Sequence, residues 1–118
     1  MGVLVALLIA AAAAPPPAYV DTGSAHVPLA ITSWCWDARC GAPLGPSSKR
    51  AFVHRGATVR LEVEFDALDA NVSVGGASTR ATARGREVTW TARHTGGLTA
   101  YVKYRRGWVI YTCCLAFR

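Results

Sequence analysis

The sequence predicts an all-β domain, with an antiparallel β-sandwich favoured over a small β-barrel. Apolar and polar residues alternate in short runs, which is the period of a strand with one face buried and the other in water. These runs recur roughly every 8 to 12 residues and are separated by glycine-containing turns, a pattern typical of sandwiches and barrels. After the first eighteen residues, no run shows the spacing of apolar residues that indicates a helix.

The first half of the chain contains three predicted strands and one long loop. "PLAITS", residues 28–33, is a short strand that leads into a cysteine-containing segment. A proline- and serine-containing loop follows at 41–56, with room for a short strand at 51–54. "TVRLEVEF", residues 58–65, has the clearest alternation, because every second residue is apolar and most of the others are charged.

The second half reads as a series of strands joined by turns. "NVSV" at 71–74 repeats the alternation, whereas "STRATA" at 78–83 has only alanines at its apolar positions and predicts a weak edge strand. "EVTWTA" at 87–92 and "LTAYVKY" at 98–104 alternate clearly. In "WVIYTCCLAF", residues 108–117, both alternating sets are largely apolar, which predicts a central strand covered on both faces or one that forms an interface.

The N-terminal residues 1–18 predict a secretory signal peptide, followed by a single domain at 27–118. The apolar run at 3–14 is shorter than the about 20 residues that span a bilayer and fits the about 7 to 15 residues of a signal. The cleavage position stays open, with Ala14, Ala18 and Ala25 as alternatives. An uncleaved N-terminal anchor is the rival interpretation, and membrane contact is expected only in that case.

The four cysteines are expected to pair, because an even number in a small exported domain is typical of disulfides. A Cys35–Cys40 bridge stabilises by about 2 kcal/mol through loop closure, and a Cys35–Cys113 bridge by about 4.5 kcal/mol. Adjacent strand residues point to opposite faces, so Cys113 and Cys114 cannot both reach one side without a bulge. We favour Cys35 with Cys40 and leave the adjacent pair unassigned, as thiols, a vicinal ring or an intermolecular bridge.

Catalytic, metal and cofactor sites are not expected. The Cys-x4-Cys spacing, followed by two adjacent cysteines far along the chain, fits structural zinc poorly. Cys35 or Cys113 with His54 or His94 and Asp37 supplies the residue types of a hydrolase, but no local catalytic signature accompanies them. We therefore expect a protein that is not an enzyme.

The charge of the chain allows two interpretations, an anionic partner or an ordinary solvated surface. Thirteen Lys and Arg against seven Asp and Glu give a net charge of +6. If neighbouring hairpins bring their basic residues to one end or face, long-range and salt-sensitive attraction follows. The candidate contacts are Arg80, Arg84, Arg86, Arg93, Lys103, Arg105 and Arg106. The alternative is an ordinary solvated surface, and no specific recognition of nucleic acid is expected.

One motif and its surroundings resemble a known group of proteins. Trp34-Cys35-Trp36 with Cys40, the proline-containing loop, "ATVRLEVEF", "VTWTA", a Gly-Gly turn and a last strand after "RRGW" resemble small secreted or lipid-anchored bacterial modules of immunoglobulin-like appearance and unassigned activity. The likeness covers most of 27–118. The chain departs from the group by lacking a lipobox cysteine and by its Cys113-Cys114 pair. The resemblance implies an immunoglobulin-like sandwich in the cell envelope or outside the cell, with no catalytic residues.

Two functions follow as expectations. The first is a secreted interaction module that binds a protein or an anionic envelope polymer through the long loop or the basic end. The second is a structural or assembly subunit that pairs with another chain through its C-terminal strand. A homodimer is one form of such an assembly. Asn71 heads an Asn-x-Ser sequence, which is a glycosylation acceptor only in a eukaryotic secretory route.

Overall fold

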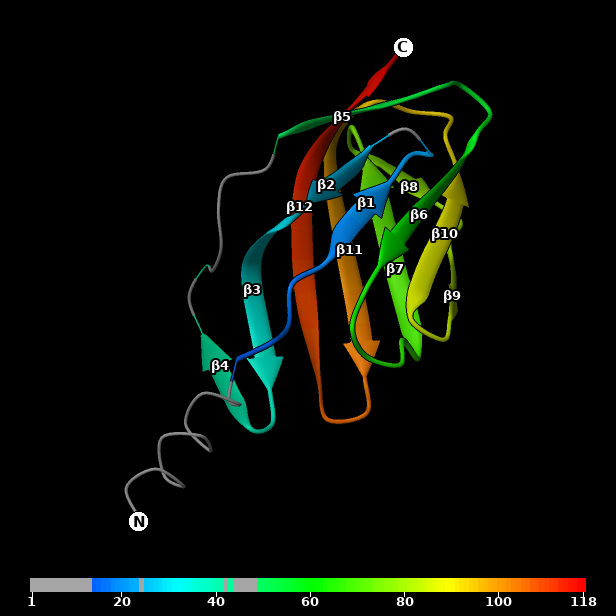
Figure 1. The fold of residues 1–118 in the computed structure, drawn as a ribbon. Coiled ribbons are helices and arrows are strands. Elements are labelled where there is room, and N and C mark those ends of the chain that lie inside the picture. The colour runs from blue at the N-terminus through cyan, green and yellow to red at the C-terminus, as the bar shows by residue number, and fades with distance from the viewer. Residues whose placement is uncertain (1–13, 24, 42, 44–48) are drawn as a thin grey trace.

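The chain folds into two β-sheets packed face to face, so the predicted all-β sandwich is confirmed (Figure 1). The computed structural model describes residues 14–23, 25–41, 43 and 49–118, apart from the side chain of Cys114. Its strands are β1 (Tyr19–Asp21), β2 (His26–Pro28), β3 (Ala30–Trp36), β4 (Arg39–Gly41), β5 (Arg50–Val53), β6 (Thr58–Glu62), β7 (Asp69–Val74), β8 (Ala77–Thr79), β9 (Thr82–Arg84), β10 (Glu87–Thr91), β11 (Gly96–Tyr104) and β12 (Gly107–Phe117). These residues contain no helix.

The strand order is that of an immunoglobulin domain with an insertion. One sheet runs β2-β1-β6-β10-β9, and the other runs β4-β3-β12-β11-β7-β8 with β5 parallel to β12. Strands β1-β6-β10-β9 take the places of A, B, E and D, and β7-β11-β12 take those of C, F and G. The strands β2 to β5 lie between A and B in sequence and extend both sheets.

The run at 78–83 forms two strands in place of one edge strand. β8 pairs with β7 in the larger sheet, and β9 pairs with β10 in the smaller one. The two residues between them, Arg80 and Ala81, carry the chain from one sheet to the other. The small alanine side chains of this run bury too little surface to hold it in a single sheet.

β1 lies where the sequence predicts no strand, whereas β5 confirms the short strand expected within the long loop. β1 enters the smaller sheet ahead of residue 27, the predicted start of the domain, and its Val20 is fully buried. β5 lies inside the predicted loop at 41–56, close to the strand expected at 51–54, and pairs with the end of β12. A strand of three residues such as β1 is too short for an alternating pattern to reveal it.

The long strand β12 lies at the centre of the larger sheet, between β11 on one edge and β3 followed by β5 on the other. Its Val109, Tyr111 and Leu115 point into the core, which explains one of its two apolar sets. A register shift leaves Thr32 as an extra residue of β3, so that Ile31 and Trp34 both pack against the core.

Candidate functional site

A groove of about 510 Å³ lies where the chain crosses from β8 to β9 beside the end of β10. β9 pairs with β10 only as far as Thr82 and Thr89, whereas β10 continues to Thr91 and pairs there with Thr58 of β6. The crossing therefore leaves one side of β10 open. The hydroxyl side chains of the wall are Thr58, Ser78, Thr79, Thr82, Thr89 and Thr91.

Three cationic or titratable side chains complete the wall of the groove. Arg80 comes from the crossing between the sheets, and Arg93 and His94 follow β10; all three are exposed. None of them forms an ion pair with another described residue, and the wall contains no carboxylate. Two guanidinium groups in an open, hydroxyl-lined groove are suited to carboxylate, sulfate or phosphate oxygens, which they bind with paired N–H groups.

Trp90 is the apolar part of the same wall. It is only 4% exposed and lies in the hydrophobic core, yet its indole Nε1 has no hydrogen-bond partner within the described part of the chain. Buried donors are nearly always paired, so an unpaired one in a native fold calls for an explanation. Trp90 therefore adds a large ring and an unused N–H donor to this part of the sandwich.

The other predicted basic contacts lie at the opposite end of the sandwich, at the lower end in Figure 1. The loop at 63–68 joins two turns there, because Ala67 N donates to Gly85 O at 2.8 Å and Leu68 N to Lys103 O at 2.9 Å. The basic residues of these turns are Arg84, Arg86, Lys103, Arg105 and Arg106. Acidic residues lie among them, namely Asp37, Glu64, Asp66 and Asp69. The seven candidates thus divide into two in the groove and five in a mixed-charge region.

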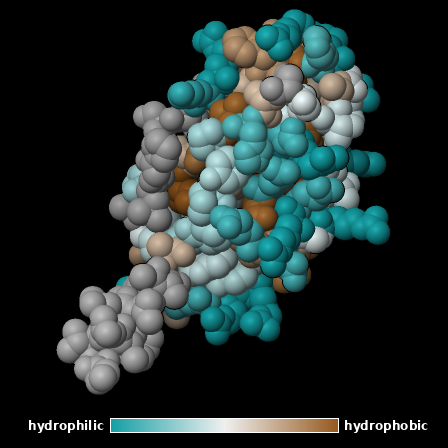
Figure 2. Space-filling model, in the orientation of Figure 1, coloured by the Kyte–Doolittle hydropathy of each residue, from teal (hydrophilic) through white to brown (hydrophobic). Residues whose placement is uncertain are grey.

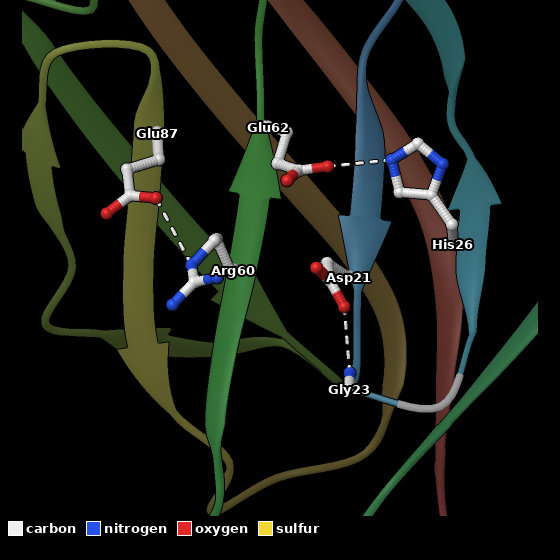
Figure 3. A network of polar contacts seen from close by, with 6 residues as sticks. All are labelled: Asp21, Gly23, His26, Arg60, Glu62 and Glu87. Carbon is white, nitrogen blue, oxygen red and sulfur yellow. Dashed lines mark hydrogen bonds and ion pairs between the residues drawn. The ribbon is translucent and has the colours of Figure 1, made fainter.

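The outer face of the smaller sheet carries paired charges. His26 Nε2 lies 2.7 Å from Glu62 Oε2, and Arg60 Nε lies 3.1 Å from Glu87 Oε2 (Figure 3). Figure 2 shows that this side of the molecule is largely hydrophilic. Because Glu62 and Glu87 contact the basic side chains of this face across strands, it does not add to the basic groove.

The predicted Cys35–Cys40 disulfide is present and joins β3 to β4. The two cysteines are direct partners across the hairpin, whose two-residue turn places Asp37 and Ala38 at φ values of 49° and 66°. Positive φ at both central residues is the geometry of a tight hairpin turn. Cys113 is buried on the core side of β12, and the side chain of Cys114 lies outside the described residues.

Asp37 fastens this hairpin to the β11–β12 turn. Tyr104 donates its hydroxyl proton to Asp37 Oδ1 at 2.6 Å, and Arg106 Nε lies 2.7 Å from the same oxygen. These contacts, the Tyr104 hydrogen bond first and Arg106 second, hold the pKa of Asp37 below its usual value. The residue that sequence analysis considers for a hydrolase is thus engaged in a structural contact.

Asp37→Asn is expected to lower the melting temperature at pH 7. A carboxyl group whose pKa is depressed by folding stabilises the protein above its unfolded pKa, here 3.8, and loses that effect as pH falls through the lower folded pKa. The difference between wild type and variant should therefore vanish in strong acid. Thermal unfolding measured from pH 7 down to pH ~2 tests this. Asp66→Asn, on the exposed loop, is the control with the same charge change, and a difference that persists in acid would contradict the assignment.

The groove contains residues that the sequence does not single out as contacts for an anion. Arg80 and Arg93 are among the predicted contacts, and His94 is considered only for a hydrolase, whereas Trp90 and the hydroxyl residues are not considered. Thr58 and Ser78 come from opposite sheets and are far apart in sequence, so that only the crossing brings them to one groove. The one sequence signal for the groove is the pair of outward-facing threonines in "EVTWTA", Thr89 and Thr91. Such a pair is found on many solvent-facing strands.

The described residues show neither a membrane-spanning helix nor a cluster of metal ligands. Within the described residues no helix has the length and apolar character to cross a membrane, and no three His, Cys, Asp or Glu side chains lie together as metal ligands would. No protein-family model matches the chain, and neither curated proteins nor solved structures gave a significant match.

Proposed function

We propose that this protein is a secreted or cell-envelope interaction module of immunoglobulin-like fold that binds an anionic polysaccharide. The observation that carries the proposal is the groove with Arg80, Arg93 and His94, which has no carboxylate in its wall. The apolar N-terminal run and the Cys35–Cys40 disulfide support export, because disulfides persist in oxidising compartments. The resemblance to secreted bacterial modules agrees with this role.

The chemistry of the wall favours a polysaccharide over an acidic peptide. Guanidinium groups bind carboxylate or sulfate groups, and the six hydroxyl side chains can both donate to and accept from sugar hydroxyls. Because most of these side chains are exposed, the groove is open enough for a chain to lie across it. A sugar that alternates charged groups with hydroxyls matches this pattern of donors and acceptors.

A non-catalytic role fits the positions of the residues with nucleophile or base chemistry. Cys35 is bonded to Cys40, Asp37 contacts Tyr104 and Arg106, and Cys113 is buried in the core. His94 lies in the wall of the groove. Cys35, Asp37 and Cys113 therefore have structural positions in the fold.

The groove predicts a selective loss of polyanion binding. Arg80→Ser with Arg93→Ser is expected to weaken binding to heparin about tenfold or more, because two charge-assisted contacts are lost. Arg84→Ser with Arg86→Ser removes the same charge from the same region of sequence and should weaken binding less than about threefold. Affinity is measured by titration calorimetry at low salt, with polygalacturonate as a carboxylated probe and neutral dextran as the uncharged control.

The outcomes separate the possible explanations. Equal losses in the two double variants would show that net charge binds the polymer and that the groove does not. Retention on heparin should also disappear at moderate salt, because exposed charges are screened. Binding that survives high salt, or no binding to either polyanion, would overturn the proposal, and preferential binding of an acidic peptide would favour a protein partner.

The alternative role as an assembly subunit has less support. β12 is paired along both edges within this chain, so that it offers no open edge for a strand of a second copy. Its outward side chains, including Trp108 and Ile110, are half-buried on the face of the larger sheet. An assembly through β12 would therefore have to use this face.

A further inference from the structure

The residues just before β1 are part of the sandwich. Pro15 is buried, and Ala18 and Val20 are fully buried. Leu29 N donates to Ala18 O at 3.0 Å, which continues the pairing of β1 with β2 beyond the strands themselves. The segment that leads into β1 therefore contributes to the core and to its hydrogen bonding (Figure 1).

Tyr111 depends on this segment for its hydrogen bond. Its side chain is fully buried on β12, at the centre of the larger sheet, and its hydroxyl donates to the carbonyl oxygen of Pro16 at 2.9 Å. Burial also raises the pKa of Tyr111, so the hydroxyl keeps its proton and remains a donor. A chain without Pro16 would leave this hydroxyl buried without that acceptor, which is costly.

β1 also holds the smaller sheet together. It lies between β2 and β6, and Val20 pairs with Val27 on one side and Leu61 on the other. Without β1, strand β2 would lose its only sheet partner in the described chain and β6 would become an edge. Cleavage after Ala25 would remove β1 entirely, and cleavage after Ala18 would remove the Pro16 carbonyl.

We infer that export processing cuts this chain on the N-terminal side of Pro15, so that Pro15 to Ala18 stay in the mature domain as a structural strap. This inference rests on the proposed export of the protein. Ala12, Ala13 and Ala14 satisfy the small-residue rule for a signal peptidase site and are followed directly by Pro15. The inference excludes the cleavage positions after Ala18 and Ala25, because each would remove a part of the chain that the sandwich uses.

The test is the N-terminus of the exported protein. The full chain, with its own N-terminal residues, is expressed in a secreting bacterium, and the exported product is examined by N-terminal sequencing and intact mass. We expect a processed chain that starts at Pro15 or a few residues earlier. An exported chain that starts at Tyr19 or His26 would overturn the inference while leaving export intact, whereas a chain that keeps Met1 and stays with the cells would overturn export as well.

A second variant tests the cleavage position after Ala25 directly, in a protein that is expected to fold like wild type. Ala25 is exposed, so Ala25→Leu should leave the fold unchanged while blocking any cleavage after residue 25. We expect the same processed start and the same amount of exported protein as for wild type. Loss of processing in this variant would show that cleavage occurs after Ala25 and would overturn the inference.

Discussion

Trp36→Ala is expected to destabilise the protein by about 3–5 kcal/mol, a large fraction of the stability of a domain of this size. Trp36 is 8% exposed and stacks on Tyr104 with ring centroids 3.7 Å apart, while Phe65 meets its edge at 5.2 Å. Truncation would leave a cavity between the two sheets and remove both ring contacts. Equilibrium unfolding in urea gives the free energy of unfolding of variant and wild type.

Trp108→Ala is the control for this prediction. Trp108 is half-buried on the outer face of β12 and stacks on Tyr101 at 5.8 Å. Its replacement should cost about 1 kcal/mol, since one exposed aromatic pair is lost without a core cavity. Equal losses for the two tryptophans would mean that the clasp hairpin, residues 34–41, does not pack its Trp36 into the core as described.

Gly107→Ala is expected to cost about 2–3 kcal/mol, because β12 and β3 approach each other too closely there for a side chain. A Cβ at this position would lie 2.1 Å from the carbonyl oxygen of Cys35 and 3.0 Å from the Tyr104 ring. Gly107 pairs with Trp36, so the shift needed to relieve the clash would disturb the end of the ladder that holds the disulfide hairpin. Urea unfolding and the exchange rates of the amides in β3 report the loss.

Gly97→Ala separates this clash from a general effect of replacing glycine. Gly97 lies on β11, and a Cβ there would meet no atom within 4 Å. Replacement should leave the stability unchanged or raise it by about 0.4–1 kcal/mol, because the unfolded chain loses freedom. A similar loss at both positions would show that close approach to Cys35 is not the cause at Gly107.

The longer strands were predictable because each carries its own alternating pattern. Residues 58–65, 71–74, 87–92 and 98–104 place apolar side chains at every second position, and strands form at all four. The two-residue turn between Cys35 and Cys40 is local as well, so that the disulfide could be predicted from spacing. These features depend on neighbours in sequence.

The short strands were not predictable in the same way. β1 and β2 have three residues each and pair with each other, and β1 also pairs with β6. The division of 78–83 between β8 and β9 depends on which sheet supplies a partner on each side of Arg80. Pairing partners distant in sequence decide these elements, and a local pattern carries no information about them.

By itself the sequence determined the strand-rich sandwich, the disulfide hairpin and a basic surface, because alternation, spacing and charge are local properties. Only the tertiary structure decided where the charges gather. It separated Arg80 and Arg93 from the other five candidate contacts and placed them with hydroxyl side chains of both sheets. The physical reason is the crossing at Arg80 and Ala81, which opens a groove between sheets whose residues are remote from one another along the chain.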